Sequence, residues 1–160
     1  MRLRTSLVVA GLIGHIGVAH PQDAAPLPKI HLVWMGGEDC PPCVAWRRFE
    51  LPKLRQSGEF QRIDFTYVIK GIGSPVPPRI FLPDEIKKYK EILDVAGAGR
   101  RGSPQVAVIV NGLVYDYFYG TRSAEDIEKM LLAIRTNVVY PFKRCLRPYP
   151  NSWSCEVSGT

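Results

Sequence analysis

Residues 30–49 read IHLVWMGGEDCPPCVAWRRF, and this stretch decides the fold. Its β-branched and aromatic start predicts a strand over Lys29–Met35, which two glycines then end. Apolar residues recur with helical spacing after the second cysteine. They predict an amphipathic helix over Cys43–Leu54, interrupted near Pro52. The two cysteines therefore lie between a strand and the start of a helix.

The pattern Cys40-Pro41-Pro42-Cys43 predicts a redox-active dithiol. Two intervening residues let both sulfur atoms meet within one turn, where the unpaired amides and the helix dipole favour a thiolate. Proline is tolerated in the first helical turn, and here two prolines stiffen the loop. We expect Cys40 to be the exposed attacking thiolate and Cys43 to resolve the mixed disulfide. A purely structural disulfide is the alternative.

The rest of the chain predicts further strands and helices around this unit. They are a strand within residues 60–70, a helix over 83–95, strands over 106–110 and 113–119, and a helix after 123. The pair Asn111-Gly112 predicts a tight hairpin, because both central positions of a type I′ turn need positive φ. Ser123 is expected to cap the last helix. This order implies an α/β fold with a mixed central sheet flanked by helices.

The domain predicted over residues 29–137 resembles the thioredoxin superfamily. The features that carry the resemblance are the strand before the dithiol, the loop Gly102–Gln105 ahead of an apolar strand, the hairpin and the final helix. The resemblance implies a thioredoxin-like fold in which Pro104 is cis. It also implies that Ser103 and Pro104 position the backbone of a substrate. The stretch from Cys43 to Pro104 is longer than in a minimal member of the family, which implies a helical insertion centred on residues 75–100, before the cis-proline loop.

Two features near the dithiol depart from that family. Asp39, preceded by Glu38, stands where the family has a tryptophan, and the two carboxylates oppose ionisation of the neighbouring thiol. Trp34 stands where the family has a buried acid. Arg100 and Arg101 are interpreted as surface charges or as groups that offset the two carboxylates. The residues expected to modulate the redox chemistry are Glu38, Asp39, Pro41 and Pro42.

The first 19 residues are predicted to be a cleaved signal peptide. Two arginines precede an apolar run from Leu7 to Val18, and Gly17 and Ala19 satisfy the small-x-small cleavage rule. An uncleaved anchor is the alternative, but the run is shorter than the roughly 20 residues that a span needs. Residues 20–28 are predicted to be a linker. The expected export, to the periplasm if the source is bacterial and otherwise by secretion, would place the cysteines in an oxidising environment.

The segment 138–160 is interpreted as a tail without clear periodicity that holds Cys145 and Cys155. A structural disulfide that pins the tail is favoured, and prolines between the two cysteines supply a turn. One alternative is a relay pair that passes electrons to Cys40. The other is a zinc site of four thiolates, which the wide spacing of this pair disfavours.

Composition excludes several classes of protein. The chain has 160 residues, of which 46% are hydrophobic, a net charge of +6 and four cysteines. This length suffices for one domain with its own core, and the cysteines are too sparse for a disulfide scaffold. The positive charge is diffuse and accompanies no nucleic-acid-binding motif. His31 would have to face Cys40 in a Cys–His hydrolase, and a partly buried strand histidine is favoured instead.

The sequence therefore predicts an exported thiol–disulfide oxidoreductase. Its partners would be protein thiols or disulfides, including a membrane or soluble redox partner, with no nucleic acid and no membrane span after cleavage. No metal or organic cofactor is expected, because the dithiol itself carries two electrons. The alternative is a non-catalytic binding or adaptor module of an envelope complex, with the dithiol permanently closed.

We predict that the signal peptide is cleaved after Ala19, since small residues stand at the cleavage positions. N-terminal sequencing of the exported protein should then begin at His20. An exported chain that begins at Met1 would contradict cleavage.

Overall fold

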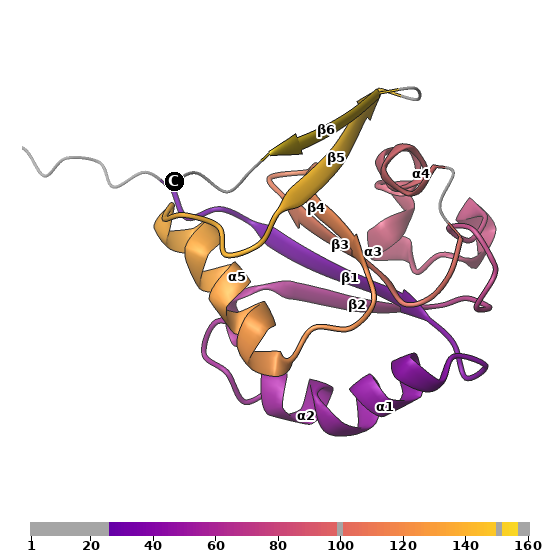
Figure 1. Ribbon diagram of the computed structural model, residues 1–160, viewed down its shortest axis with the longest axis horizontal. Helices are drawn as coiled ribbons and strands as arrows, with labels where there is room; N and C mark the ends of the chain where they lie inside the picture. Colours follow the sequence, from indigo (N-terminus) through magenta and orange to yellow (C-terminus); the bar gives the residue numbers. More distant parts are fainter. Residues whose placement is uncertain (1–25, 99–100, 150–151, 157–160) are drawn as a thin grey trace, which may run out of the picture.

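A four-stranded mixed sheet forms the centre of the computed structural model, which describes residues 26–98, 101–149 and 152–156. Its strands are ordered β2-β1-β3-β4, with β1 (Ile30–Gly36) parallel to β2 (Asp64–Ile69) and antiparallel to β3 (Gln105–Val110). The edge strand β4 (Leu113–Tyr119) is antiparallel to β3 (Figure 1). The predicted mixed α/β sheet is confirmed. The predicted signal peptide and most of the linker lie outside the described residues.

Helices cover both faces of this sheet (Figure 1). On one face lie α1 (Pro41–Phe49), α2 (Leu51–Leu54) and α5 (Ala124–Thr136). On the other lie α3 (Asp84–Lys87) and α4 (Lys90–Gly97). Two short 3-10 turns, η1 (Phe60–Arg62) and η2 (Arg79–Phe81), lie in the connections.

The central strand β1 is buried along its whole length, and its side chains alternate between two cores. Leu32 and Trp34 belong to the core beneath α1, α2 and α5, whereas Val33 and Met35 belong to the core beneath α3 and α4. Trp34 stacks on Trp46 of α1, with 3.6 Å between ring centroids. This stack fixes α1 directly above the strand that precedes it.

The predicted turn and cap are confirmed. Asn111 and Gly112 have φ values of 51° and 86°, the left-handed conformation that the tight hairpin requires. Ser123 caps α5, and its Oγ accepts the backbone N–H of Asp126 at 3.1 Å.

The structure differs from the sequence predictions in three segments. The helix predicted over Cys43–Leu54 begins earlier, at Pro41, and divides at Glu50, so that Pro52 falls in the first turn of α2, where its missing N–H costs nothing. The helix predicted over residues 83–95 divides into α3 and α4. The tail was expected to be irregular, but it forms a hairpin of β5 (Arg144–Tyr149) and β6 (Ser152–Glu156). This hairpin was not predicted because each of its strands is stabilised by hydrogen bonds to the other strand, which the periodicity of a single segment does not reveal.

The beginning of the predicted tail is part of the main core. Tyr140 is buried, and its hydroxyl donates to the Asp116 carboxylate at 2.7 Å. Arg122 pairs with the same carboxylate at 3.3 Å. Its guanidinium lies 3.7 Å from the ring centroid of Phe118 and 4.0 Å from that of Phe142. These contacts attach the chain after α5 to the sheet.

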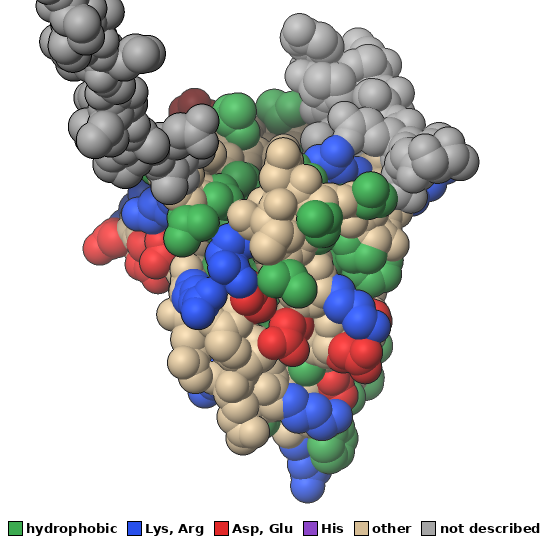
Figure 2. All heavy atoms as spheres, turned by 90° about the vertical axis from the view of Figure 1, so that its left-hand side faces the viewer, with side chains coloured by type: hydrophobic (Ala, Val, Ile, Leu, Met, Phe, Trp, Pro, Cys, Tyr) green, Lys and Arg blue, Asp and Glu red, His purple; other side chains and the backbone are tan. Residues whose placement is uncertain are grey.

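The end of the molecule that faces the viewer in Figure 2 carries hydrophobic side chains interspersed with charges of both signs. At the beginning of β1 and the end of α5, a hollow is lined by Leu27, Tyr115 and Ile134 among others. Within the described residues, no helix is long and apolar enough to cross a membrane.

We predict that Trp34→Ala lowers the free energy of unfolding by about 3–5 kcal/mol, because it removes a fully buried indole and leaves a cavity. Urea unfolding measures the change. Ile80→Ala, at a side chain that is 79% exposed, is the control and should change stability by less than about 0.5 kcal/mol. Equal effects of the two substitutions would show that the tryptophan stack does not support the core.

Candidate functional site

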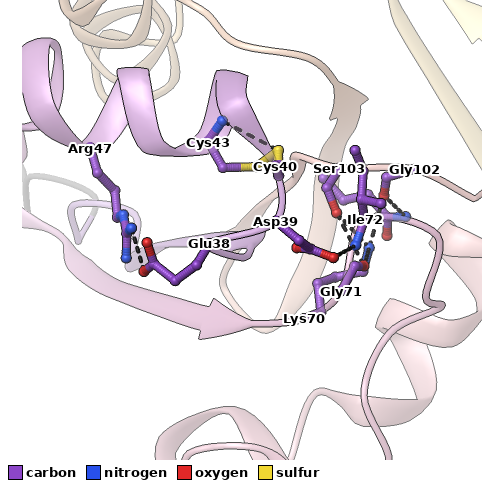
Figure 3. The surroundings of a disulfide bond; sticks show 11 residues. Glu38, Asp39, Cys40, Cys43, Arg47, Lys70, Gly71, Ile72, Gly102 and Ser103 are labelled. Carbon is purple, nitrogen blue, oxygen red and sulfur yellow. Dashed lines mark hydrogen bonds and ion pairs between the residues drawn. A yellow bond between two sulfur atoms is a disulfide. The ribbon is translucent and has the colours of Figure 1, made fainter.

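Cys40 and Cys43 form a disulfide where the loop after β1 enters α1 (Figure 3). Cys40 is the N-cap residue, and its Sγ accepts the backbone N–H of Cys43 at 3.3 Å. The Cys40 carbonyl accepts the same N–H at 2.9 Å. At this helix N-terminus, the helix dipole and the hydrogen bond from the Cys43 N–H stabilise the Cys40 sulfur as a thiolate once the disulfide is reduced. The predicted position of the pair at a helix start is confirmed.

Both cysteines are completely buried, whereas Pro41 and Pro42 between them are exposed. The expectation that Cys40 is exposed is therefore wrong for the disulfide form. The two prolines occupy the first two positions of α1 and lie on the surface, while the sulfur atoms lie beneath it. Any molecule that reacts with the disulfide would therefore have to reach a sulfur atom that the rest of the site encloses.

Three loops meet beside the dithiol, and two side chains join them (Figure 3). From the first loop, Asp39 accepts the backbone N–H of Ile72 at 2.9 Å. From the second, the ammonium group of Lys70 donates to the Gly102 carbonyl at 2.8 Å and to the Ser103 hydroxyl at 2.9 Å. The loop before the dithiol, the loop after β2 and the loop before β3 are thus bonded to one another.

Lys70 is a buried cation that the sequence analysis did not identify. Only 4% of the residue is exposed, and burial lowers the pKa of its ammonium group, against the opposing effect of the nearby Asp39 carboxylate. In the sequence, only its position directly after the second strand indicated that Lys70 could lie near the dithiol. Apart from the adjacent Gly71 carbonyl at 3.4 Å, its hydrogen-bond partners lie more than thirty residues away in the chain, so the sequence could not reveal them.

The peptide bond between Ser103 and Pro104 is cis, as the family resemblance implies. Gly102 before it has a φ of 123°, which favours glycine. The Pro104 carbonyl accepts the backbone N–H of Gly120 at 3.1 Å, and the Ser103 side chain faces Lys70. The loop is thereby held from both sides.

The two carboxylates before the dithiol are both engaged. Glu38 forms an ion pair with Arg47 of α1, and this hydrogen bond raises the pKa of the guanidinium. Asp39 is held by the Ile72 amide and faces Lys70. The cations that offset the carboxylates are thus Arg47 and Lys70. Arg100 and Arg101 are the cations that the sequence predicts as alternatives, and Arg100 lies outside the described residues.

A groove of about 340 Å³ lies beside the dithiol, between α1 and the loop that leads into α5. Pro42 lines one end of it, and Trp46 and Phe49 line its wall. The Trp46 indole donates to the Arg122 carbonyl at 2.9 Å, which fixes the opposite side. The remaining lining residues are Ala45, Glu50, Thr121 and Ser123.

His31 does not take part in this site. Its Nε2 lies 2.9 Å from the Thr66 hydroxyl, and burial lowers the pKa of its imidazole. It lies five residues before Gly36 on β1, roughly 16 Å along an extended strand. The favoured interpretation of His31 as a buried strand histidine is confirmed.

Cys145 and Cys155 lie directly opposite each other in the register of the β5–β6 hairpin. Their side chains lie outside what the structure describes, so the predicted disulfide stays a prediction. In the part of the chain that is described, no three His, Cys, Asp or Glu side chains converge as metal ligands would.

No protein-family model matches this sequence, and a search of curated proteins found no significant match.

We predict that Asp39→Asn accelerates the attack of reduced Cys40 on an aromatic disulfide at pH 6 about two- to fivefold. The amide still accepts the Ile72 N–H but no longer opposes the thiolate, and unit charges a few ångströms apart in water interact by about 1 kcal/mol or less. Stopped-flow absorbance of the released aromatic thiol gives the rate.

Asp64→Asn is the matched control, because that exposed carboxylate begins β2 and pairs with Lys29 at 3.7 Å. Its rate should equal that of the wild type. If Asp39→Asn also leaves the rate unchanged, the charge of Asp39 does not act on Cys40.

Proposed function

We propose that the protein is a thiol–disulfide oxidoreductase that exchanges electrons with protein cysteines through Cys40 and Cys43. One observation carries the proposal: Cys40 Sγ caps the N-terminus of α1. It accepts a hydrogen bond from the Cys43 backbone N–H and forms the disulfide with Cys43 Sγ. Such a position stabilises the thiolate, which is the nucleophile in exchange.

The exchange would proceed in two balanced steps. The Cys40 thiolate attacks a partner disulfide, forms a mixed disulfide and releases one partner thiolate. The Cys43 thiol then loses its proton and attacks Cys40 Sγ, which closes the internal disulfide and releases the second partner thiolate. The partner gains two electrons and its two thiolates take up the protons. Run in reverse, the same steps oxidise a partner dithiol.

The surroundings of the dithiol support a peptide substrate. The cis-Pro104 loop lies beside it in a conformation held by Lys70, and the groove next to Pro42 continues along α1. The order of strands and helices, the cis-proline and the hairpin support a thioredoxin-like fold, in which α3 and α4 would be the predicted helical insertion. With the predicted signal peptide, this supports exported redox chemistry on protein partners.

A second candidate is a binding or adaptor module whose disulfide stays closed. The complete burial of both cysteines favours it, because an enclosed disulfide resists attack by a partner thiolate.

The reduction potential of the Cys40–Cys43 couple decides between the two candidates. We predict a value between about −120 and −270 mV, the range of catalytic dithiols, whereas a structural bond lies below about −300 mV. Equilibration with glutathione and dithiothreitol buffers, followed by thiol alkylation and mass analysis, gives the potential.

Cys40→Ser should abolish both insulin reduction and oxidation of a dithiol peptide. The control Cys145→Ser with Cys155→Ser leaves the dithiol intact and should retain activity. Full activity of Cys40→Ser would exclude the proposed reaction.

A further inference from the structure

The end of β1 leaves a small space beside the inner sulfur of the dithiol. A Cβ at Gly36 would lie 2.6 Å from Cys43 Sγ and 3.2 Å from the hydroxyl oxygen of Tyr67. Contacts below 3.0 Å are too short for a real side chain, so the absence of one at Gly36 lets these two groups share the space. The inner sulfur and the tyrosine hydroxyl therefore border the same gap.

The Tyr67 hydroxyl is buried and, among the described residues, has no hydrogen-bond partner. Buried hydroxyl groups are usually paired, so an unpaired one needs an explanation. Tyr67 lies opposite Trp34 in the β1–β2 register, and the Arg47 guanidinium lies 5.2 Å from its ring centroid. The ring is thus fixed with its hydroxyl at the gap beside Cys43.

We propose that the Tyr67 hydroxyl is the hydrogen-bond donor to Cys43 Sγ when the dithiol is reduced. This inference rests on the proposed function and deepens it. Reduction breaks the disulfide and turns the Cys43 sulfur into a thiol or thiolate. That sulfur is a better hydrogen-bond acceptor than a disulfide sulfur, and it lies beside the Tyr67 hydroxyl, which has no other acceptor among the described residues.

The state of the hydroxyl suits this function. Burial raises the pKa of Tyr67, and although Arg47 opposes the shift, the phenol stays protonated at neutral pH and acts as a donor. Glu38 adds to the shift in the same direction as burial. Among the described residues, the charged side chains around the dithiol are Glu38 and Asp39 from the preceding loop, Arg47 from α1 and Lys70 from the end of β2.

In the second step of exchange, the Cys43 thiol gives up its proton, which ends on the departing partner thiolate. Cys43 Sγ then forms a bond to Cys40 Sγ, and the mixed disulfide breaks. The Tyr67 hydroxyl keeps its own proton throughout and lowers the energy of the Cys43 thiolate by its hydrogen bond. It therefore affects the second step and leaves the first step, the attack by Cys40, unaffected.

Tyr67→Phe separates the two steps in an experiment. The reduced mature chain carries Cys145→Ser and Cys155→Ser, so that the dithiol supplies all the thiols, and is mixed with dithiobis(nitrobenzoate). The first equivalent of nitrothiobenzoate reports attack by Cys40, and the second reports closure by Cys43. We expect the second phase of Tyr67→Phe to be about tenfold slower at pH 7, with its pH midpoint moved upward, and the first phase to be unchanged.

Tyr89→Phe is the control, since it removes a hydroxyl on the opposite face of the sheet. Both of its phases should match the wild type. A difference infrared spectrum of the wild-type protein provides a measurement without substitution: the phenol C–O band of Tyr67 should shift on reduction.

The outcomes are distinguishable. A wild type that releases one equivalent and never closes overturns the proposed function together with this inference. A wild type that closes, with a Tyr67→Phe variant that closes at the same rate, overturns the inference alone. Equal slowing of both phases also overturns it, because it indicates a disturbed site rather than a lost bond to Cys43.

Discussion

The two positions at the end of β1 and directly after it, Gly36 and Gly37, have no room for a side chain, and the arrangement of the site depends on this constraint. A Cβ at Gly36 would meet Cys43 Sγ, and a Cβ at Gly37 would lie 2.5 Å from the Lys70 carbonyl oxygen. Because both positions are glycine, the strand can pass directly beneath the start of α1 and beside the end of β2. The stack of Trp34 on Trp46 then holds the helix in this position. The dithiol is therefore packed against the sheet rather than carried on a mobile loop.

The close packing creates a site that balances its own charges. Two carboxylates precede the dithiol, and in water they would oppose a thiolate there. Glu38 is paired with Arg47, while Asp39 bonds to a backbone amide and faces the buried Lys70. The same Lys70 ammonium group donates hydrogen bonds to the Gly102 carbonyl and the Ser103 hydroxyl of the cis-proline loop. Loss of its charge would therefore weaken the hydrogen bonds that hold this loop.

Burial and reactivity act against each other in this site. Enclosure of both sulfur atoms strengthens every electrostatic interaction with them, since the surroundings have a lower dielectric constant than water. It also places the sulfur atoms beneath the exposed Pro41 and Pro42, the second of which lines the adjoining groove. An exchange reaction at this dithiol would require a sulfur atom to become accessible, whereas a closed disulfide at the same place would serve only to fix the loop to the helix.

The sequence by itself determined the features that depend on neighbouring residues. They include the strand before the dithiol, the start of a helix at the cysteines, the Asn111-Gly112 hairpin and the Ser123 cap, because turn and cap preferences act over a few residues. It did not reveal the break between α3 and α4, the β5–β6 hairpin or the burial of Cys40. The partners of Lys70 and the position of the Tyr67 hydroxyl beside Cys43 were decided only by the tertiary structure. Both depend on segments that are distant in the chain and are brought together by the packing of the sheet.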